Sequence, residues 1–284
     1  MLTWVFLTST GLQAMSNTLA VSLVQSQIAW HDPAKNLATF ERRLEALAPD
    51  RPDIVVLPET FASGFTQHPE QCSETMSGDA VNWMTGMAQQ LGTAVCGSLA
   101  IKASEGYYNR FLFVTKDGVL AHYDKKHLFT LAGEHHRYQP GQERVVFEYR
   151  GWRICPQVCY DLRFPVFSRC RNDYDLLIYV ANWPSPRRAA WTRLLKARAI
   201  ENQCYVAAVN RVGTDGNGWA YPGESVLLDF MGDSLLDLGD QEATGTATVD
   251  LDQQQQFRTR FAFWQDADAF ELVDSEAEPH RAAS

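Results

Sequence analysis

Short apolar runs alternate with segments of helical periodicity over most of the chain. The runs are rich in β-branched and aliphatic residues, which is typical of strands buried on both faces of a sheet. They lie at residues 19–25, 53–57, 93–99, 152–158, 175–180 and 204–210. The alternation predicts repeated strand–helix units.

Between these runs, apolar residues recur three and four positions apart, as on one face of an amphipathic helix. Asp32 and Pro33 supply an N-cap and a first-turn proline for one helix, and Gly92 ends another. The predicted helices cover about residues 33–47, 81–91 and 186–203, and a further one begins near Asp161.

The middle of the chain breaks this alternation. Turn dipeptides at residues 117–118 and 150–151 each stand between short apolar runs, and their glycines tolerate the positive φ of a hairpin turn. Strand–helix units early and late, with hairpins between them, predict an α/β fold. No repeat or linker divides the chain, and the glycine-rich loop at residues 213–223 matches no phosphate-binding pattern.

The composition narrows the class of protein. The 284 residues are 45% apolar and 21% charged, which excludes disorder for most of the chain. The net charge of −9 argues against a nucleic-acid binder, because that role needs clustered Lys and Arg. Six cysteines in so long a chain are far from the disulfide density of small secreted scaffolds. We therefore expect a cytoplasmic protein in a reducing compartment.

Both ends of the chain differ from the rest. The first 30 residues carry no charged side chain, but their apolar stretch is too short for a secretory signal or for a membrane span of about 20 residues. The last residues are acidic and then small. We expect a mobile leader over residues 1–17, one folded domain over 18–272, a mobile acidic tail over 273–284, and no membrane association.

Three short segments place reactive side chains just past predicted strands. Glu59 follows an apolar strand and a proline, where partial burial would raise the pKa of a carboxylate toward the range of a general base. Cys159 stands between a strand and a helix, where helix N–H groups stabilise a thiolate. Lys125 and Lys126 follow a hairpin strand, and alone such a pair is typical of a solvated surface.

The remaining cysteines and histidines indicate no metal site. Cys155 and Cys159 have C-x3-C spacing without a second pair or zinc-type His spacing, and the cysteines other than Cys159 are expected in the core. The His135-His136 pair is typical of a polar loop. We expect neither a metal nor a cofactor.

Taken together, Glu59, Lys125 and Cys159 resemble the Glu-Lys-Cys triad of the nitrilase superfamily of carbon-nitrogen hydrolases, which follows Pro-Glu, Lys-x-His-Leu and Cys-Tyr-Asp motifs. The resemblance covers about residues 18–272. It extends to Gly133-Glu134 with Pro140-Gly141, to Ala181-Asn182-Trp183-Pro184 and to residues 198–202. Residues 263–268 are similar to the omega-amidase branch, whose members hydrolyse the terminal amide of 2-oxoglutaramate and 2-oxosuccinamate.

The resemblance implies a role for each matching residue. Cys159 would attack the amide carbon to form a thioester, and Glu59 would take the thiol proton and later activate water. Lys125, with the backbone N–H of Tyr160, would hold the negative charge on the substrate oxygen. Glu134 matches a second family glutamate, for which an ion pair that holds Lys125 in place and a direct chemical role both stay open.

Charge matching indicates where the substrate would bind. A 2-oxo dicarboxylate monoamide carries a carboxylate, which calls for a guanidinium donor in so acidic a protein. Arg187 and Arg188 are the candidates, whereas Arg163 is expected to pair with an acidic neighbour. A narrow apolar wall would favour a short substrate. The aromatic candidates for that wall are Phe61, Phe129, Tyr160 and Trp183.

The superfamily fold is an α-β-β-α sandwich of four layers with two central mixed sheets, and its members associate through helices near the nucleophile. We expect that fold, a homodimer or larger homo-oligomer, and hydrolysis of an omega-amide of a 2-oxo acid. Alternatives within the superfamily are an aliphatic amidase, a nitrilase or an N-carbamoyl amidase. Alternatives of other classes are a thiol hydrolase with His127 or His136 as its base, and a non-catalytic binding module.

Overall fold

Two six-stranded mixed sheets form the centre of the protein. The computed structural model describes residues 17–272, so nearly all of the expected leader and the whole expected tail lie outside the described residues. The first sheet has the order β14 (Ala243–Asp250), β1 (Thr18–Gln25), β2 (Ile54–Val56), β3 (Ala94–Ala103), β4 (Gly106–Thr115) and β5 (Gly118–Asp124). The second has the order β13 (Ser234–Asp237), β12 (Val226–Leu228), β9 (Tyr205–Asn210), β8 (Leu176–Ala181), β7 (Trp152–Val158) and β6 (Phe147–Tyr149).

Each sheet is built around parallel strands. Strands β1, β2 and β3 are parallel in the first sheet, and β7, β8 and β9 are parallel in the second. Antiparallel strands flank both sets, including the β4–β5 and β6–β7 hairpins expected from their turn dipeptides. The carboxyl ends of parallel neighbours meet at one edge of a sheet, which is where ligands usually bind in α/β proteins.

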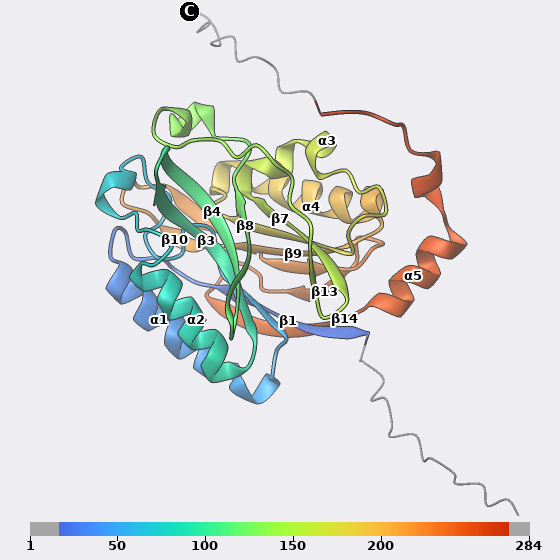
Figure 1. Ribbon diagram of the computed structural model, residues 1–284, viewed down its shortest axis with the longest axis horizontal. Helices are drawn as coiled ribbons and strands as arrows, with labels where there is room; N and C mark the ends of the chain where they lie inside the picture. Colours follow the sequence, from blue (N-terminus) through green and yellow to red (C-terminus); the bar gives the residue numbers. More distant parts are fainter. Residues whose placement is uncertain (1–16, 273–284) are drawn as a thin grey trace, which may run out of the picture.

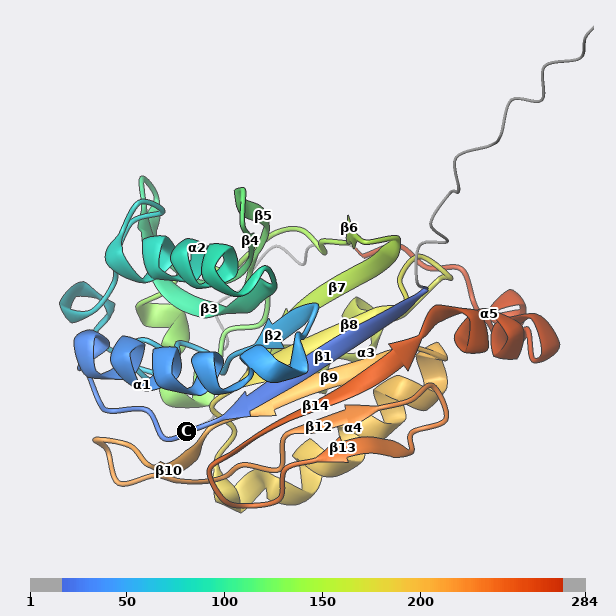
Figure 2. The same cartoon turned by 90° about the horizontal axis from the view of Figure 1, so that it is seen from below.

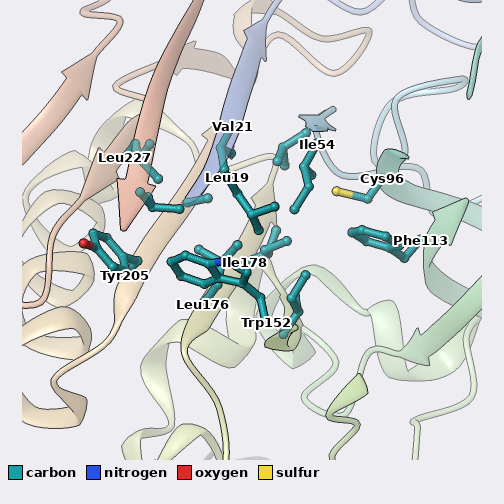
Figure 3. Packing of buried hydrophobic residues seen from close by; sticks show 14 of the residues in the cluster. Leu19, Val21, Ile54, Cys96, Phe113, Trp152, Leu176, Ile178, Tyr205 and Leu227 are labelled. Carbon is teal, nitrogen blue, oxygen red and sulfur yellow. The ribbon is translucent and has the colours of Figure 1, made fainter. Parts of the chain in front are cut away.

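The two sheets face each other across a shared core. Apolar side chains from the inner faces of both sheets form one cluster. Figure 3 shows Leu19, Val21 and Phe113 of the first sheet gathered with Trp152 and Ile178 of the second. The outer faces of the sheets therefore need their own cover.

Helices supply that cover. Helices α1 (Pro33–Ala46) and α2 (Asp79–Leu91) pack on the first sheet, and α4 (Arg188–Asn202) packs on the second. Figure 1 shows α1 and α2 on one side of the strands and α4 on the other. These four layers confirm the predicted α-β-β-α sandwich. Helix α3 (Pro165–Ser168) is a single turn, and α5 (Leu251–Arg260) continues from β14, which runs beside β1 (Figure 2).

Local signals in the sequence explain several element boundaries. The Asp32 carboxylate accepts a hydrogen bond from the Lys35 backbone N–H, so it caps α1 as expected. Gly92 adopts φ +65° and ends α2. No helix among residues 17–272 is both long and apolar enough to cross a membrane.

Two local expectations are wrong. The segment after β7 forms a 3-10 helix (Cys159–Arg163) rather than an α-helix, and α3 follows it. The glycine-rich loop holds two short strands, β10 (Val212–Thr214) and β11 (Ala220–Pro222), paired with each other. Three-residue strands are too short to show alternation of apolar and polar positions, so their sequence carries no strand signal.

Substitution of Phe113 tests the packing between the sheets. Phe113 on β4 is fully buried and lies against Phe147 and Tyr149 of β6, at ring-centroid distances of 4.8 and 5.1 Å. We expect Phe113→Ala to lower the free energy of unfolding by about 3–5 kcal/mol, because it leaves a cavity between the sheets. Denaturant unfolding measures this. Val119→Ala, at a partly exposed position of the edge strand β5, should lower the free energy of unfolding by less than about 0.5 kcal/mol. Equal losses in the two variants would contradict the place of Phe113 in the core between the sheets.

Candidate active site

Side chains from both sheets meet in one pocket at the strand ends. Glu59 lies just past β2, Lys125 directly follows β5, Cys159 directly follows β7, and Asn182 directly follows β8. All four line one pocket. Its other walls include Phe65, Phe129, Tyr160, Trp183, Arg163 and Arg187.

Lys125 is buried between two carboxylates. Its Nζ lies 3.1 Å from Glu59 Oε1 and 3.0 and 2.9 Å from the two oxygens of Glu134, and all three side chains are at most 1% exposed. Burial disfavours the ammonium, but the Glu134 and Glu59 carboxylates outweigh burial and raise the pKa of Lys125 well above its ordinary value. Lys125 is therefore charged at neutral pH.

Glu134 owes its place to the backbone as well as to the lysine. Its Oε2 accepts a hydrogen bond of 2.6 Å from the Phe129 backbone N–H. Burial raises the pKa of Glu134, and Lys125 opposes that rise. The carboxylate thus joins the loop after β5 to the lysine at the start of that loop.

Two amide side chains orient Glu59. Asn109 Nδ2 donates to Glu59 Oε1 at 2.7 Å, and Ser98 fixes Asn109 by donating to its Oδ1 at 2.8 Å. Asn182 donates to Glu59 Oε2 from its backbone N–H at 2.7 Å and from Nδ2 at 3.2 Å. Each carboxylate oxygen of Glu59 is therefore held by at least one neutral donor.

Cys159 occupies a strained turn. Its φ of +47° is in the left-handed region, which costs a residue other than glycine about 1–3 kcal/mol and is commonest at functional sites. Burial and then the Glu59 carboxylate raise the pKa of the thiol well above its ordinary value, while Lys125 acts in the opposite sense. The resting side chain is thus a neutral thiol. The helix that begins at this turn is a 3-10 helix (Cys159–Arg163) rather than the predicted α-helix.

Asp161 holds the turn in place. Its fully buried carboxylate accepts hydrogen bonds from the Val158 N–H at 2.9 Å and the Tyr123 hydroxyl at 2.8 Å. It also accepts from the backbone N–H and the ring Nδ1 of His127, at 3.0 and 2.7 Å. One carboxylate therefore connects the turn that carries Cys159 to the segment that carries Lys125.

Comparison with known proteins identifies the family of the chain. A sequence model of the carbon-nitrogen hydrolase family matches residues 20–259. The chain belongs to the carbon-nitrogen hydrolase family. It is 48% identical over 255 residues to a protein named omega-amidase YafV from Escherichia coli strain K12, covering 89% of this chain and 98% of that one. It is 32% identical over 251 residues to a 2-oxoglutaramate amidase from Bacillus subtilis strain 168, covering 87% and 96%.

Solved structures of related proteins share the fold. A carbon-nitrogen hydrolase superfamily protein from Xanthomonas campestris, described with an arsenic adduct in its active site, is 47% identical with a TM-score of 0.87, covering 90% of this chain and 99% of that one. A mutant amidase from Nesterenkonia, described with acrylamide added to its active-site cysteine, is 26% identical with a TM-score of 0.73, covering 86% and 98%.

Most of the predicted site residues of this hydrolase come together. Phe129, Tyr160, Trp183 and Arg187 line the pocket beside the three triad candidates. Phe61 does not. The turn at Thr60, with φ +43°, directs Phe61 under α1, where it is fully buried and meets the edge of Phe40 at 5.5 Å.

The arginines are arranged differently from the prediction. Arg188 forms an exposed ion pair with Glu224 outside the pocket, because successive residues on a helix point in different directions. Arg163 lies in the pocket with its guanidinium 4.9 Å from the Trp183 ring centroid, and Arg187 lies 4.9 Å from that of Phe129. Within the described part of the chain neither guanidinium forms an ion pair, so the expectation of an acidic partner for Arg163 is wrong.

Three residues of the site have no counterpart among the sequence-based candidates. Asn109 and Phe65 stand in no recognisable motif, and Asn182 stands in the segment that resembles the family but had no assigned role. Asn109 reaches Glu59 from β4 of the same sheet, whereas Asn182 reaches it from the second sheet. Within residues 17–272, no cluster of three or more His, Cys, Asp or Glu side chains is arranged to hold a metal ion.

Replacement of Asp161 tests its part in holding the cysteine turn. Asp161→Asn replaces one carboxylate oxygen with an NH₂ group, which faces the N–H and O–H donors that the carboxylate binds. Each donor left unpaired lowers the free energy of unfolding by about 1–3 kcal/mol. We expect a lower free energy of unfolding and faster hydrogen exchange at the Val158 and His127 amides, measured by denaturant titration and mass spectrometry. Asp117→Asn, at an exposed carboxylate bonded to Lys116, should change neither. Unchanged exchange in Asp161→Asn would contradict the role.

Proposed function

We propose that this hydrolase cleaves the terminal amide of a small 2-oxo dicarboxylic acid monoamide, such as 2-oxoglutaramate or 2-oxosuccinamate, and releases ammonia. The observation that carries the proposal is a candidate nucleophile, a candidate base and a buried cation in one pocket, which is also lined by two guanidinium groups without carboxylate partners. Relatives at 48% and 32% identity are named omega-amidase and 2-oxoglutaramate amidase.

Acylation begins with the neutral Cys159 thiol. Glu59 takes the Sγ proton as the sulfur attacks the amide carbon, and the carbonyl electron pair moves to the oxygen. Lys125 Nζ and the backbone N–H of Tyr160 hold that oxyanion. Protonated Glu59 then gives its proton to the nitrogen, the C–N bond breaks, and ammonia leaves a thioester on Cys159.

Deacylation uses the same groups. Glu59 takes a proton from water, the water oxygen attacks the thioester carbon, and the oxyanion forms again beside Lys125. The C–S bond then breaks, and the sulfur recovers the proton from Glu59. The acid leaves, and the enzyme returns to its starting state.

The ion pairs of Lys125 fit this role. An oxyanion needs a donor that is already charged and oriented, because reorganisation during the reaction would cost rate. Glu134 keeps Lys125 charged and fixed without facing the substrate, since Glu134 is fully buried and does not line the pocket. We assign Glu134 a positioning role rather than a direct chemical one.

The pocket favours a short anionic substrate. Arg187 and Arg163 are held by the faces of Phe129 and Trp183, so their N–H groups remain free to bind a carboxylate. The two carboxylates of Glu59 and Glu134 carry more charge than the single ammonium of Lys125. The two arginines offset this excess negative charge, which would otherwise repel an anionic substrate. The aromatic side chains that line the pocket favour a short chain.

The alternatives of other classes have less support. His127 binds Asp161 and stacks on Phe164, and neither His127 nor His136 lines the pocket. A binding module would not need a strained cysteine beside a buried lysine–glutamate pair. Aliphatic amidase, nitrilase and N-carbamoyl amidase activities remain as alternatives within the superfamily, and a substrate panel separates them.

We further propose one catalytic domain over residues 18–272 and a homodimer or larger homo-oligomer in the cytoplasm. All six cysteines are free, in keeping with a reducing compartment. The oligomer rests on the resemblance to the superfamily. Size-exclusion chromatography with light scattering measures the number of subunits.

Ammonia release tests the function and the base together. With 2-oxoglutaramate, glutamine, a simple nitrile and an N-carbamoyl amino acid as substrates, we expect the highest kcat/KM for 2-oxoglutaramate. Glu59→Gln should lower kcat by about 10²–10⁴-fold because it removes the general base. Glu105→Gln, at an exposed position, serves as the control. Activity that survives in Glu59→Gln but is lost in His127→Ala would support the thiol hydrolase instead.

Adjacent arginines give a matched test of carboxylate binding. Arg187→Ala should raise KM for 2-oxoglutaramate about 10-fold or more, since it removes charged hydrogen bonds to the substrate. The KM for a neutral amide should change by less than about 3-fold. Arg188→Ala should leave both constants near wild type because Arg188 lies outside the pocket. Equal effects of Arg187→Ala on both substrates would refute the assignment.

A further inference from the structure

Asn182 is placed to do more than orient the base. It directly follows β8, and its Nδ2 donates to the backbone carbonyl of Glu59 at 2.8 Å and to Thr60 Oγ1 at 3.2 Å. A carbonyl oxygen only accepts hydrogen bonds, so the contact with it identifies which end of the amide is nitrogen. The other end of the side chain is therefore the acceptor Oδ1.

This acceptor has no partner. Asn182 is 5% exposed and lines the pocket, and Oδ1 forms no hydrogen bond within the described part of the chain. Buried polar atoms are almost always paired, because an unpaired one loses its bonds to water without replacement. An unpaired acceptor at the wall of a ligand pocket indicates that the ligand supplies the donor.

We propose that Asn182 Oδ1 accepts a hydrogen bond from the N–H group of the substrate's terminal amide, so that Asn182 selects primary amides. The proposal rests on the proposed function. When the C–N bond breaks, the nitrogen must direct its lone pair at protonated Glu59, so its own two N–H groups point elsewhere. Asn182 Nδ2 contacts Glu59 Oε2 directly, so the side chain lies next to the group that would protonate the leaving nitrogen.

The contact discriminates between chemical classes of substrate. A primary amide presents two N–H donors to the base side of the pocket, whereas an ester or a nitrile presents none. With an ester or a nitrile, Oδ1 stays unpaired and buried. The site then binds the transition state less tightly than it does with a primary amide. Lys125 and the Tyr160 N–H bind the oxygen of amide and ester alike, so they do not make this distinction.

A pair of substrates isolates the contact. We compare the 2-oxo acid terminal amide with the terminal methyl ester of the same acid, and follow release of the common product acid. The constant to compare is kcat/KM, because it reports the steps up to and including acylation. The amide and the ester differ in leaving group during acylation, whereas both give the same thioester, whose hydrolysis does not enter kcat/KM. If wild type prefers another amide of the panel, that amide and its ester replace the pair.

Asn109 provides the matched control. Asn109 Nδ2 also donates to Glu59, but Asn109 does not line the pocket. Asn109→Ala should therefore lower kcat/KM for amide and ester by the same factor. Asn182→Ala should lower the value for the amide about 10-fold more than that for the ester. The same amide-to-ester ratio in Asn182→Ala as in wild type overturns the proposal.

A measurement on the wild type keeps the proposal testable if Asn182→Ala does not fold. The N-methyl amide lacks one N–H donor, and we expect its kcat/KM to be at least about 10-fold below that of the primary amide. Equal values would overturn the role of Asn182 while leaving the proposed function intact. A wild type that hydrolyses no primary amide overturns both.

Discussion

The charge of Lys125, buried between Glu59 and Glu134, is the interaction on which the site depends. An isolated ammonium in a protein interior would lose its proton, because burial disfavours the charged form. Here two carboxylates outweigh burial and keep the lysine charged without water. Burial and then the Glu59 carboxylate raise the pKa of the Cys159 thiol, and Lys125 only partly opposes them, so the side chain rests as a thiol. In the mechanism that we propose, attack by the sulfur is coupled to proton transfer, and the neighbouring carboxylate accepts the proton.

The sandwich makes this arrangement possible by bringing two sheets together at their strand ends. Glu59 and Lys125 come from the first sheet, whereas Cys159 and Asn182 come from the second. Neither sheet holds a complete set of groups. The contact between the sheets thus sets the distances of the chemistry, and the carboxylate of Asp161, which bonds to segments from both sheets, maintains it locally.

The sequence predicts the layers better than the pocket walls. Apolar runs and turn dipeptides locate β1, β2, β7 and the hairpins, because buried parallel strands and tight turns have strong local signals. The side on which Phe61 packs depends on a positive φ at Thr60, and the pairing of Arg188 depends on Glu224 far along the chain. The residues next to Phe61 and Arg188 in the sequence do not predict either contact. The triad candidates were found because each stands in a motif that resembles a family, whereas Asn109 stands in none.

The overall charge of the protein and the charge of its pocket have opposite consequences for an anionic substrate. A net charge of −9 repels anions at a distance, but charges separated by more than about 10 Å are largely screened at ordinary ionic strength. Within the pocket, Arg163 and Arg187 are the groups that we propose bind the carboxylate, and stacking on Trp183 and Phe129 holds them without carboxylate partners. An acidic residue paired with either arginine would fix the guanidinium equally well but would occupy the donors proposed to bind the substrate. Aromatic faces orient the arginines and leave those donors free.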